Sequence, residues 1–157
     1  MRILIASLIV LVSIAGCSGK NSNGAPSPKA IANTVFKGLK EDAFGKIADL
    51  ALPDESDNEA FVRQNTEEKE EDIYERKYNR QKWVKELEYA FNIVRGKYNE
   101  AAWKTAEIVS YDGLNDYGRY AQISITIQLE GRRDVLYIGE AKKQNGKWYL
   151  TTTPEWD

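Results

Sequence analysis

The stretch Tyr120–Leu129 reads Tyr-Ala-Gln-Ile-Ser-Ile-Thr-Ile-Gln-Leu. From Ala121 onward an aliphatic side chain occupies every second position, and Gln, Ser or Thr occupies the positions between. Side chains of a β-strand alternate between two faces, so this period of two predicts a strand. A clean alternation is typical of an antiparallel sheet with one buried and one solvated face. We therefore expect Ile123 and Ile125 to lie in the hydrophobic core.

Three further strands are expected around this one. They are Trp103–Tyr111, Asp134–Lys142 and Trp148–Thr153. The last two are joined through Asn145-Gly146, and the Asn-Gly pair is the strongest short signal for a two-residue hairpin turn. The predicted arrangement is an antiparallel meander of four strands.

Helical patterns precede these strands. Apolar residues recur at helical spacing in Lys29–Lys40 and in Gln81–Val94, which is the strongest helix pattern of the chain. Between them we expect a short helix, Ala43–Leu50, with Asp42 as its N-cap. Helices followed by an antiparallel sheet indicate the α+β class.

The Gln81–Val94 helix is expected to lie across the sheet. Its Trp83, Leu87 and Phe91 stand at the offsets of a single apolar face. We predict that this face packs on the aliphatic side of the sheet and on Trp148, which opens the last strand.

The segment 58–82 is rich in charge and poor in apolar residues. Five of the six residues from Glu67 to Asp72 are acidic. The pair Asp72 and Arg76, four positions apart, is compatible with a solvated helix. Two interpretations remain open, an exposed helix or insertion and an acidic docking surface for a cationic partner.

The N-terminus has the parts of a secretory signal. Arg2 supplies the positive charge, Ile3–Ile14 is an apolar run, and the small residues Ala15 and Gly16 precede Cys17, the only cysteine. The run is shorter than the roughly 18 to 20 residues of a membrane-spanning helix. Its ending resembles the lipobox of bacterial lipoproteins. The resemblance implies cleavage after residue 16, diacylglycerol on the sulfur of Cys17 and an acyl chain such as palmitate on its amine. Plain secretion and an uncleaved anchor are the alternatives.

The residues after Cys17 are small, polar or helix-breaking. We expect residues 17–28 to form a flexible tether and residues 29–157 to form one domain. Ser18 follows the cysteine, a pattern that in enterobacteria-like lipoproteins accompanies export to the outer membrane. The expected place is the bacterial cell envelope, facing the periplasm from the outer membrane if the host is Gram-negative. The membrane is then a partner through the lipid on Cys17.

Composition excludes several function classes. Without Arg2 the chain has 21 basic and 24 acidic residues, a net charge of −3, and gives no support for nucleic-acid binding. Histidine is absent, which excludes Ser-His-Asp and Cys-His catalysis and histidine-based zinc sites. There is no glycine-rich phosphate loop and no cluster of metal-ligating residues, so we expect no cofactor and no metal.

The order of elements and one motif carry a resemblance to a known family. The order includes the strand stretches Tyr120–Ile127 and Val135–Ile138, and the motif is Asn145–Trp148, whose Gly-Lys-Trp leads into the strand that continues to Leu150. They resemble the small envelope lipoproteins of the nuclear transport factor 2-like superfamily, whose domains are mostly of unknown function. The resemblance implies a strongly curved, cystatin-like sheet that wraps a long helix into a cone with a cavity. Both enzymes of the ketosteroid isomerase and scytalone dehydratase types and non-enzymatic modules use that fold.

We predict a binding or scaffolding function rather than catalysis. An acid/base enzyme in a cone needs a polar group on its inner face, where this sequence places Ile123 and Ile125. The protein is therefore expected to be a membrane-tethered module that binds an envelope protein or a small ligand. The alternatives are a cone-pocket isomerase or dehydratase and a structural subunit of an envelope or secretion assembly. The residues expected to line a pocket or the core are Trp83, Phe91, Trp103, Tyr137 and Trp148.

Overall fold

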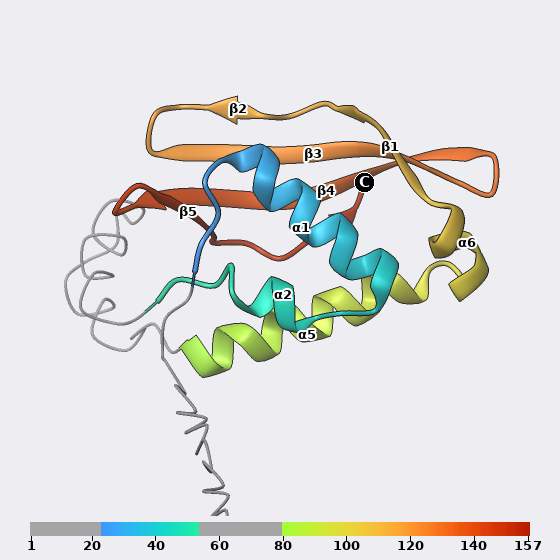
Figure 1. Ribbon diagram of the computed structural model, residues 1–157, viewed down its shortest axis with the longest axis horizontal. Coiled ribbons are helices and arrows are strands. Elements are labelled where there is room, and N and C mark those ends of the chain that lie inside the picture. The colour runs from blue at the N-terminus through green and yellow to red at the C-terminus, as the bar shows by residue number, and fades with distance from the viewer. Residues whose placement is uncertain (1–22, 54–79) are drawn as a thin grey trace, which may run out of the picture.

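The structure is a computed structural model that describes residues 23–53 and 80–157 (Figure 1). The signal peptide, the lipidation of Cys17, the first part of the tether and most of the charged segment 58–82 are predictions that lie outside the described residues. No helix in the described part of the chain is both long enough and apolar enough to cross a bilayer.

The helices come before the sheet, as predicted. Two of them lie before the undescribed segment 54–79, and two follow it. They are α1 (Pro28–Glu41), α2 (Gly45–Ala48), α5 (Arg80–Gly96) and α6 (Glu100–Thr105).

Both ends of α1 are set by side-chain and backbone chemistry. The Ser27 hydroxyl caps the N-terminus by accepting the N–H of Ala30 at 3.1 Å. Asp42 adopts the left-handed conformation, with φ of 54°, and its N–H donates to the carbonyl of Gly38. Asp42 therefore ends α1, and the prediction that it caps the next helix is wrong. The N-cap of α2 is Phe44.

The strands form an antiparallel sheet with the hydrogen-bonded order β1-β3-β4-β5, so the predicted meander is confirmed. Two short strands extend its edges, because β2 pairs with β3 and β6 pairs with β4. The strands are β1 (Glu107–Tyr111), β2 (Asn115–Asp116), β3 (Tyr120–Leu129), β4 (Arg132–Gln144), β5 (Lys147–Leu150) and β6 (Glu155–Trp156).

The sheet is neither closed nor strongly curled, which corrects the cone that the family resemblance implies (Figure 1). Strong curvature requires bulges or glycine kinks repeated along neighbouring strands. Along the ladder between β3 and β4 the register shifts once, between Ile123 and Ser124, opposite Gly139. A second shift, between Ile108 and Ser110, lies in the ladder of β1 and β3. These isolated bulges bend the sheet locally and leave it open.

Residues 103–106 do not belong to the first strand, which corrects the predicted strand Trp103–Tyr111. The Asn99 side chain accepts the N–H of Ala102 at 2.9 Å and starts α6, which contains Trp103. A capped helix with Glu100 in its first turn is favoured over an extended chain here. The strand β1 begins at Glu107.

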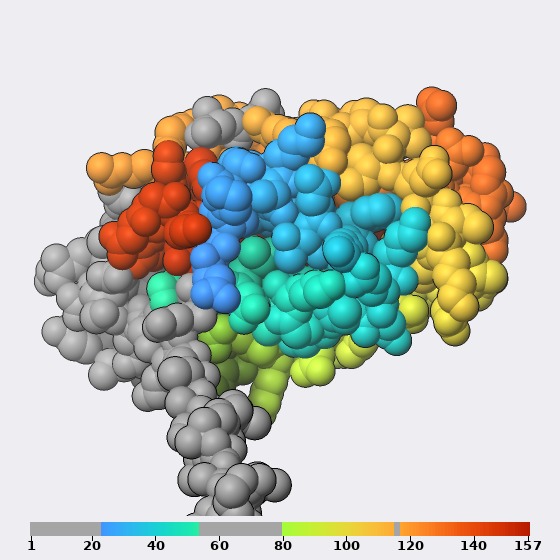
Figure 2. Space-filling model, in the orientation of Figure 1, coloured from blue at the N-terminus to red at the C-terminus, as the bar shows by residue number. Residues whose placement is uncertain are grey.

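The helix that lies on the sheet is α1, which contacts β3, β4 and β5. α5 packs mainly against α1, α2 and β6, so the prediction that Gln81–Val94 crosses the sheet is wrong. α1 buries five residues and α5 three, which makes α1 the better cover for the aliphatic face. Both helices share one core with β3, in which Ile123 and Ile125 are fully buried as predicted. Figure 2 shows α1 and α2 forming the face of the molecule in front of this core.

The chain joins the sheet before α1 begins. Ala25 and Trp148 exchange two backbone hydrogen bonds of 2.8 and 2.7 Å, so Ala25 extends the edge of β5. Further along, the N–H of Leu150 donates to the carbonyl of Leu50 at 2.8 Å. The last residues of the stretch expected to be tether, from Ala25 to Pro28, are therefore held by the domain.

Candidate functional site

A groove of about 800 Å³, named here the α5–β6 groove, lies between α5 and the C-terminal residues. One wall is a stripe of α5 residues at helical spacing, Lys82, Lys85, Glu86, Tyr89, Ala90, Ile93 and Val94. The other wall is the segment Thr153–Trp156. The neighbouring face of α5, with Leu87 and Phe91, points into the core, and Val94 belongs to both the core and the groove.

Two large apolar side chains on the α5 wall are exposed to solvent. Tyr89 is 71% exposed and Ile93 is 55% exposed. They lie four positions apart on α5, so they share one face of the helix. A cluster of exposed apolar side chains that lines a groove marks an interaction site more often than scattered ones do.

The opposite wall is held firmly by Trp156. Its indole N–H donates to the carbonyl of Val94 at 3.0 Å, which ties β6 to α5. Its ring lies 5.5 Å from that of Tyr98 and 6.2 Å from that of Trp103 between ring centroids. The indole N–H of Trp103 in turn donates to the carbonyl of Arg95 at 2.8 Å. The groove is therefore preformed, because its C-terminal wall is fixed by aromatic packing and two indole hydrogen bonds.

A charged group adjoins this aromatic cluster. Asp134 accepts hydrogen bonds from the Lys97 ammonium at 2.9 Å and from the Tyr98 hydroxyl. The Lys97 ammonium also lies 4.4 Å from the centre of the Trp156 ring, a cation–π contact. The bond from Lys97, followed by the bond from Tyr98, holds the pKa of the Asp134 carboxyl below its usual value. The same carboxylate raises the pKa of Tyr98 to about 12.

These shifts define what the cluster can do chemically. With its lowered pKa, Asp134 is ionised at neutral pH and cannot donate a proton, while Tyr98 keeps its own. An acid/base catalyst instead needs a carboxyl whose pKa is raised toward neutrality. Hydrogen bonds lower the pKa of three other described carboxyl groups as well, those of Glu41, Glu100 and Asp112. The described residues also contain no group of three acidic, histidine or cysteine side chains that could hold a metal ion.

Asp134→Asn should lower the free energy of unfolding by about 1 to 2 kcal/mol at pH 7, since Asp134 is only partly buried. Because its folded pKa is depressed, ionised Asp134 stabilises the fold above the unfolded pKa near 3.8. That stabilisation is lost as the pH falls through the pKa of Asp134 in the folded protein. Urea unfolding at pH 7 and below pH 3 measures the difference between wild type and variant, which should shrink in acid. The exposed Glu107→Gln is the control, and an equal difference at both pH values would contradict the assignment.

Of the five aromatic residues predicted to line a pocket or the core, three are buried in the core: Phe91, Trp103 and Trp148. Trp83 is partly buried against the same core, on α5. Tyr137 pairs with Ser124 on the polar side of the sheet, where burial raises its pKa. None of the five lines the α5–β6 groove.

Sequence reasoning missed the residues that do line the groove. Trp156 stands in a two-residue strand, too short to show a period, and Tyr89 and Ile93 fall on the polar side of the helix pattern. The sequence did contain one signal for the groove. Tyr89 and Ile93 are two large apolar residues four positions apart on the outer face of an otherwise charged helix. Comparisons with protein-family models, curated proteins and solved structures find no match to the chain.

Proposed function

We propose that the protein is a lipid-anchored, non-catalytic module of the bacterial envelope that binds a partner protein through the α5–β6 groove. The observation that carries this proposal is the exposure of Tyr89 and Ile93 beside the fixed ring of Trp156. Aromatic residues are enriched in the cores of protein interfaces, where a few buried anchors supply most of the binding energy. A preformed wall also lowers the entropic cost of binding.

A small apolar ligand is the second candidate for the same groove. Its volume of about 800 Å³ lies within the roughly 300 to 1,000 Å³ of small-molecule sites. Such sites enclose most of the ligand, whereas Tyr89 and Ile93 extend mostly into solvent. The exposure favours a protein segment laid along α5.

The resemblance to nuclear transport factor 2-like envelope lipoproteins belongs to this proposal. It is supported by the order of helices followed by an antiparallel meander and by the lipobox-like ending at Cys17. The open sheet weighs against the alternative of a cone-pocket isomerase or dehydratase, because those enzymes enclose their substrate in the cone. The lowered pKa of Asp134 beside Tyr98 weighs against it as well.

The groove is tested with a photo-crosslinking amino acid placed at position 93 of the lipidated protein in its own cells. Position 109 is the matched control, because Val109 is another exposed aliphatic residue, 42% exposed, on β1 outside the groove. We expect a crosslinked protein from position 93 alone. Ile93→Asp should then weaken binding of that purified protein by at least about tenfold, as loss of a central apolar anchor does, and Val109→Asp should leave it unchanged.

The outcomes separate the candidates. A crosslink between two copies of this chain identifies the partner as a second copy and favours the structural-subunit alternative. Equal products from both positions, or wild-type binding by the Ile93→Asp variant, would refute the groove as the docking site.

Cys17→Ser should abolish labelling of the protein with a radioactive or clickable fatty acid. The expectation follows from the Ala15-Gly16-Cys17 ending and the absence of any second cysteine. The variant should also be released from the membrane fraction or accumulate as the uncleaved precursor. Ser18→Ala is the control and should be acylated as the wild type is. Acyl labelling and membrane fractionation that do not change in the Cys17→Ser variant would exclude the lipid anchor.

A further inference from the structure

The chain enters the domain at one end of the sheet, and this fixes which end lies nearest the proposed lipid. Ala25 is hydrogen-bonded to the backbone of Trp148 through both its N–H and its carbonyl. Gly24 lies against Tyr149, because a Cβ added to Gly24 would be 2.7 Å from the tyrosine ring. Five residues lie between Cys17 and Asn23, and the six residue steps from one to the other span about 20 Å at most when the chain is extended. This inference takes the lipid on Cys17 from the proposed function. With that lipid in the bilayer, the point where the chain enters the sheet stays within about 20 Å of the bilayer surface.

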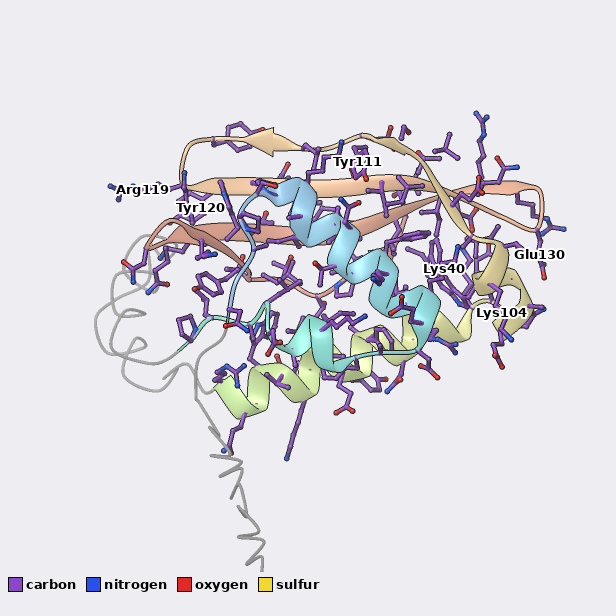
Figure 3. All side chains as sticks on the ribbon, in the orientation of Figure 1. Lys40, Lys104, Tyr111, Arg119, Tyr120 and Glu130 are labelled. Carbon is purple, nitrogen blue, oxygen red and sulfur yellow. The ribbon has the colours of Figure 1, made fainter. Side chains whose placement is uncertain are left out.

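The same end of the sheet carries four basic residues, named here the basic end: Arg119, Lys142, Lys143 and Lys147. The backbone pairing brings them together, because the N–H of Lys143 donates to the carbonyl of Arg119 at 2.8 Å. Lys147 is paired with Gln144 across the hairpin between β4 and β5. In Figure 3, Arg119 lies at one end of the sheet and Glu130 at the other. Figure 2 shows the hairpin (red) beside the entering chain (blue).

Three of the four cations of the basic end form no ion pair with a carboxylate that the structure describes. These three are Arg119, Lys143 and Lys147. The pKa of Lys142 is lowered by burial and by the positive charge of Arg119, so these two cations are close neighbours. This concentration of positive charge stands out in a chain whose basic residues are outnumbered by acidic ones.

An exposed aromatic residue accompanies these cations. Tyr117 is 68% exposed, and its N–H donates to the carbonyl of Tyr120 at 2.8 Å in the turn that also contains Arg119. Tyrosine is enriched at membrane–water interfaces, where its ring meets the headgroup region and its hydroxyl meets water.

We infer that the basic end is a membrane-facing surface that binds the anionic headgroups of the bilayer holding the anchor. Basic residues near an anionic membrane surface are attracted to it within a Debye length, and the short chain from Cys17 keeps them there. The contact orients the domain. The α5–β6 groove lies on helix and C-terminal residues outside the basic end, so it stays accessible to a partner.

The test uses the lipidated mature protein on vesicles of phosphatidylcholine, with or without a minority of phosphatidylglycerol. A fluorophore on Tyr117→Cys reports on the basic end, and one on Lys104→Cys reports on the opposite end, where Figure 3 places Lys104. A quencher attached to lipid headgroups measures how close each label comes. We expect strong quenching at position 117 and weak quenching at 104, only on vesicles with the anionic lipid, with loss of the difference at about 0.5 M salt.

Arg119→Glu with Lys147→Glu should reduce the population of this orientation by at least about tenfold, as expected for two cations reversed near an anionic surface. The control is the double variant Lys37→Glu with Lys104→Glu, which changes the net charge by the same amount. Measured with the label at position 117, this control should leave the population of the orientation unaltered. Equal quenching of both labels, or quenching indifferent to anionic lipid, would refute the membrane-facing surface while the anchor stands. A protein that does not float with the vesicles at all refutes the anchor itself, and with it this orientation.

Discussion

Replacing Trp148 with alanine should lower the free energy of unfolding by about 3 to 5 kcal/mol, as expected for truncation of a buried tryptophan. Trp148 is only 2% exposed and belongs to the same core cluster as Ile123 and Ile125. It also stands where two parts of the chain meet, since its backbone exchanges two hydrogen bonds with Ala25. The truncation would leave a cavity at the edge where β5 holds the entering chain.

Urea unfolding of the purified protein measures this effect. Tyr117→Ala is the control, because it removes a large aromatic side chain that is mostly exposed, and it should change the free energy by no more than about 0.5 kcal/mol. Trp148→Phe should lie between the two, since it retains most of the buried ring. A loss below about 1 kcal/mol for Trp148→Ala would mean that the indole is not part of the core.

The strand β3 could be predicted from sequence because its period of two continues for ten residues without interruption. The register that follows buries Ile123 and Ile125, and the turn residues on either side then fix the order of the meander. The helices α1 and α5 could likewise be read from their apolar stripes. These are local signals, repeated often enough to decide an element by themselves.

The packing of these elements could not be read in the same way. Both α1 and α5 have an apolar face, and a periodic pattern does not say which face meets a sheet and which meets another helix. The residues from Trp103 onward also fit the period of two that is typical of a strand. Only the cap formed by Asn99 distinguishes helix from strand at this point. The groove combines residues from two elements that are far apart in the sequence, and its second wall depends on Trp156 in a strand of two residues.

Gly139→Ala should lower the free energy of unfolding by about 3 kcal/mol, the largest effect expected for a change of one methyl group. Gly139 has φ of 130°, a conformation that side chains rarely adopt. A Cβ there would lie 2.8 Å from the hydroxyl and 2.9 Å from the carbonyl oxygen of Thr152. Thr152 cannot move away freely, because its hydroxyl accepts the N–H of Glu140 at 2.7 Å.

Gly146→Ala separates the two causes of this loss. Gly146 also has a positive φ, 76°, but a Cβ there meets nothing within 4 Å, so its cost should be limited to about 1 to 2 kcal/mol of backbone strain. Chemical unfolding of the two variants side by side gives the contribution of the contact with Thr152. Equal losses would show that strain alone is responsible.

The consequence of Gly139→Ala should reach the groove. Thr151 and Thr152 are bonded to Glu140 at the bulge, and the chain runs from them through Pro154 to Trp156. Displacing Thr152 therefore shifts the wall of the groove that Trp156 forms. The indole N–H resonance of Trp156 should move in the NMR spectrum of Gly139→Ala and stay in place in that of Gly146→Ala. A stable Gly139→Ala protein with an unmoved Trp156 signal would show that the bulge does not set the path of the C-terminal wall.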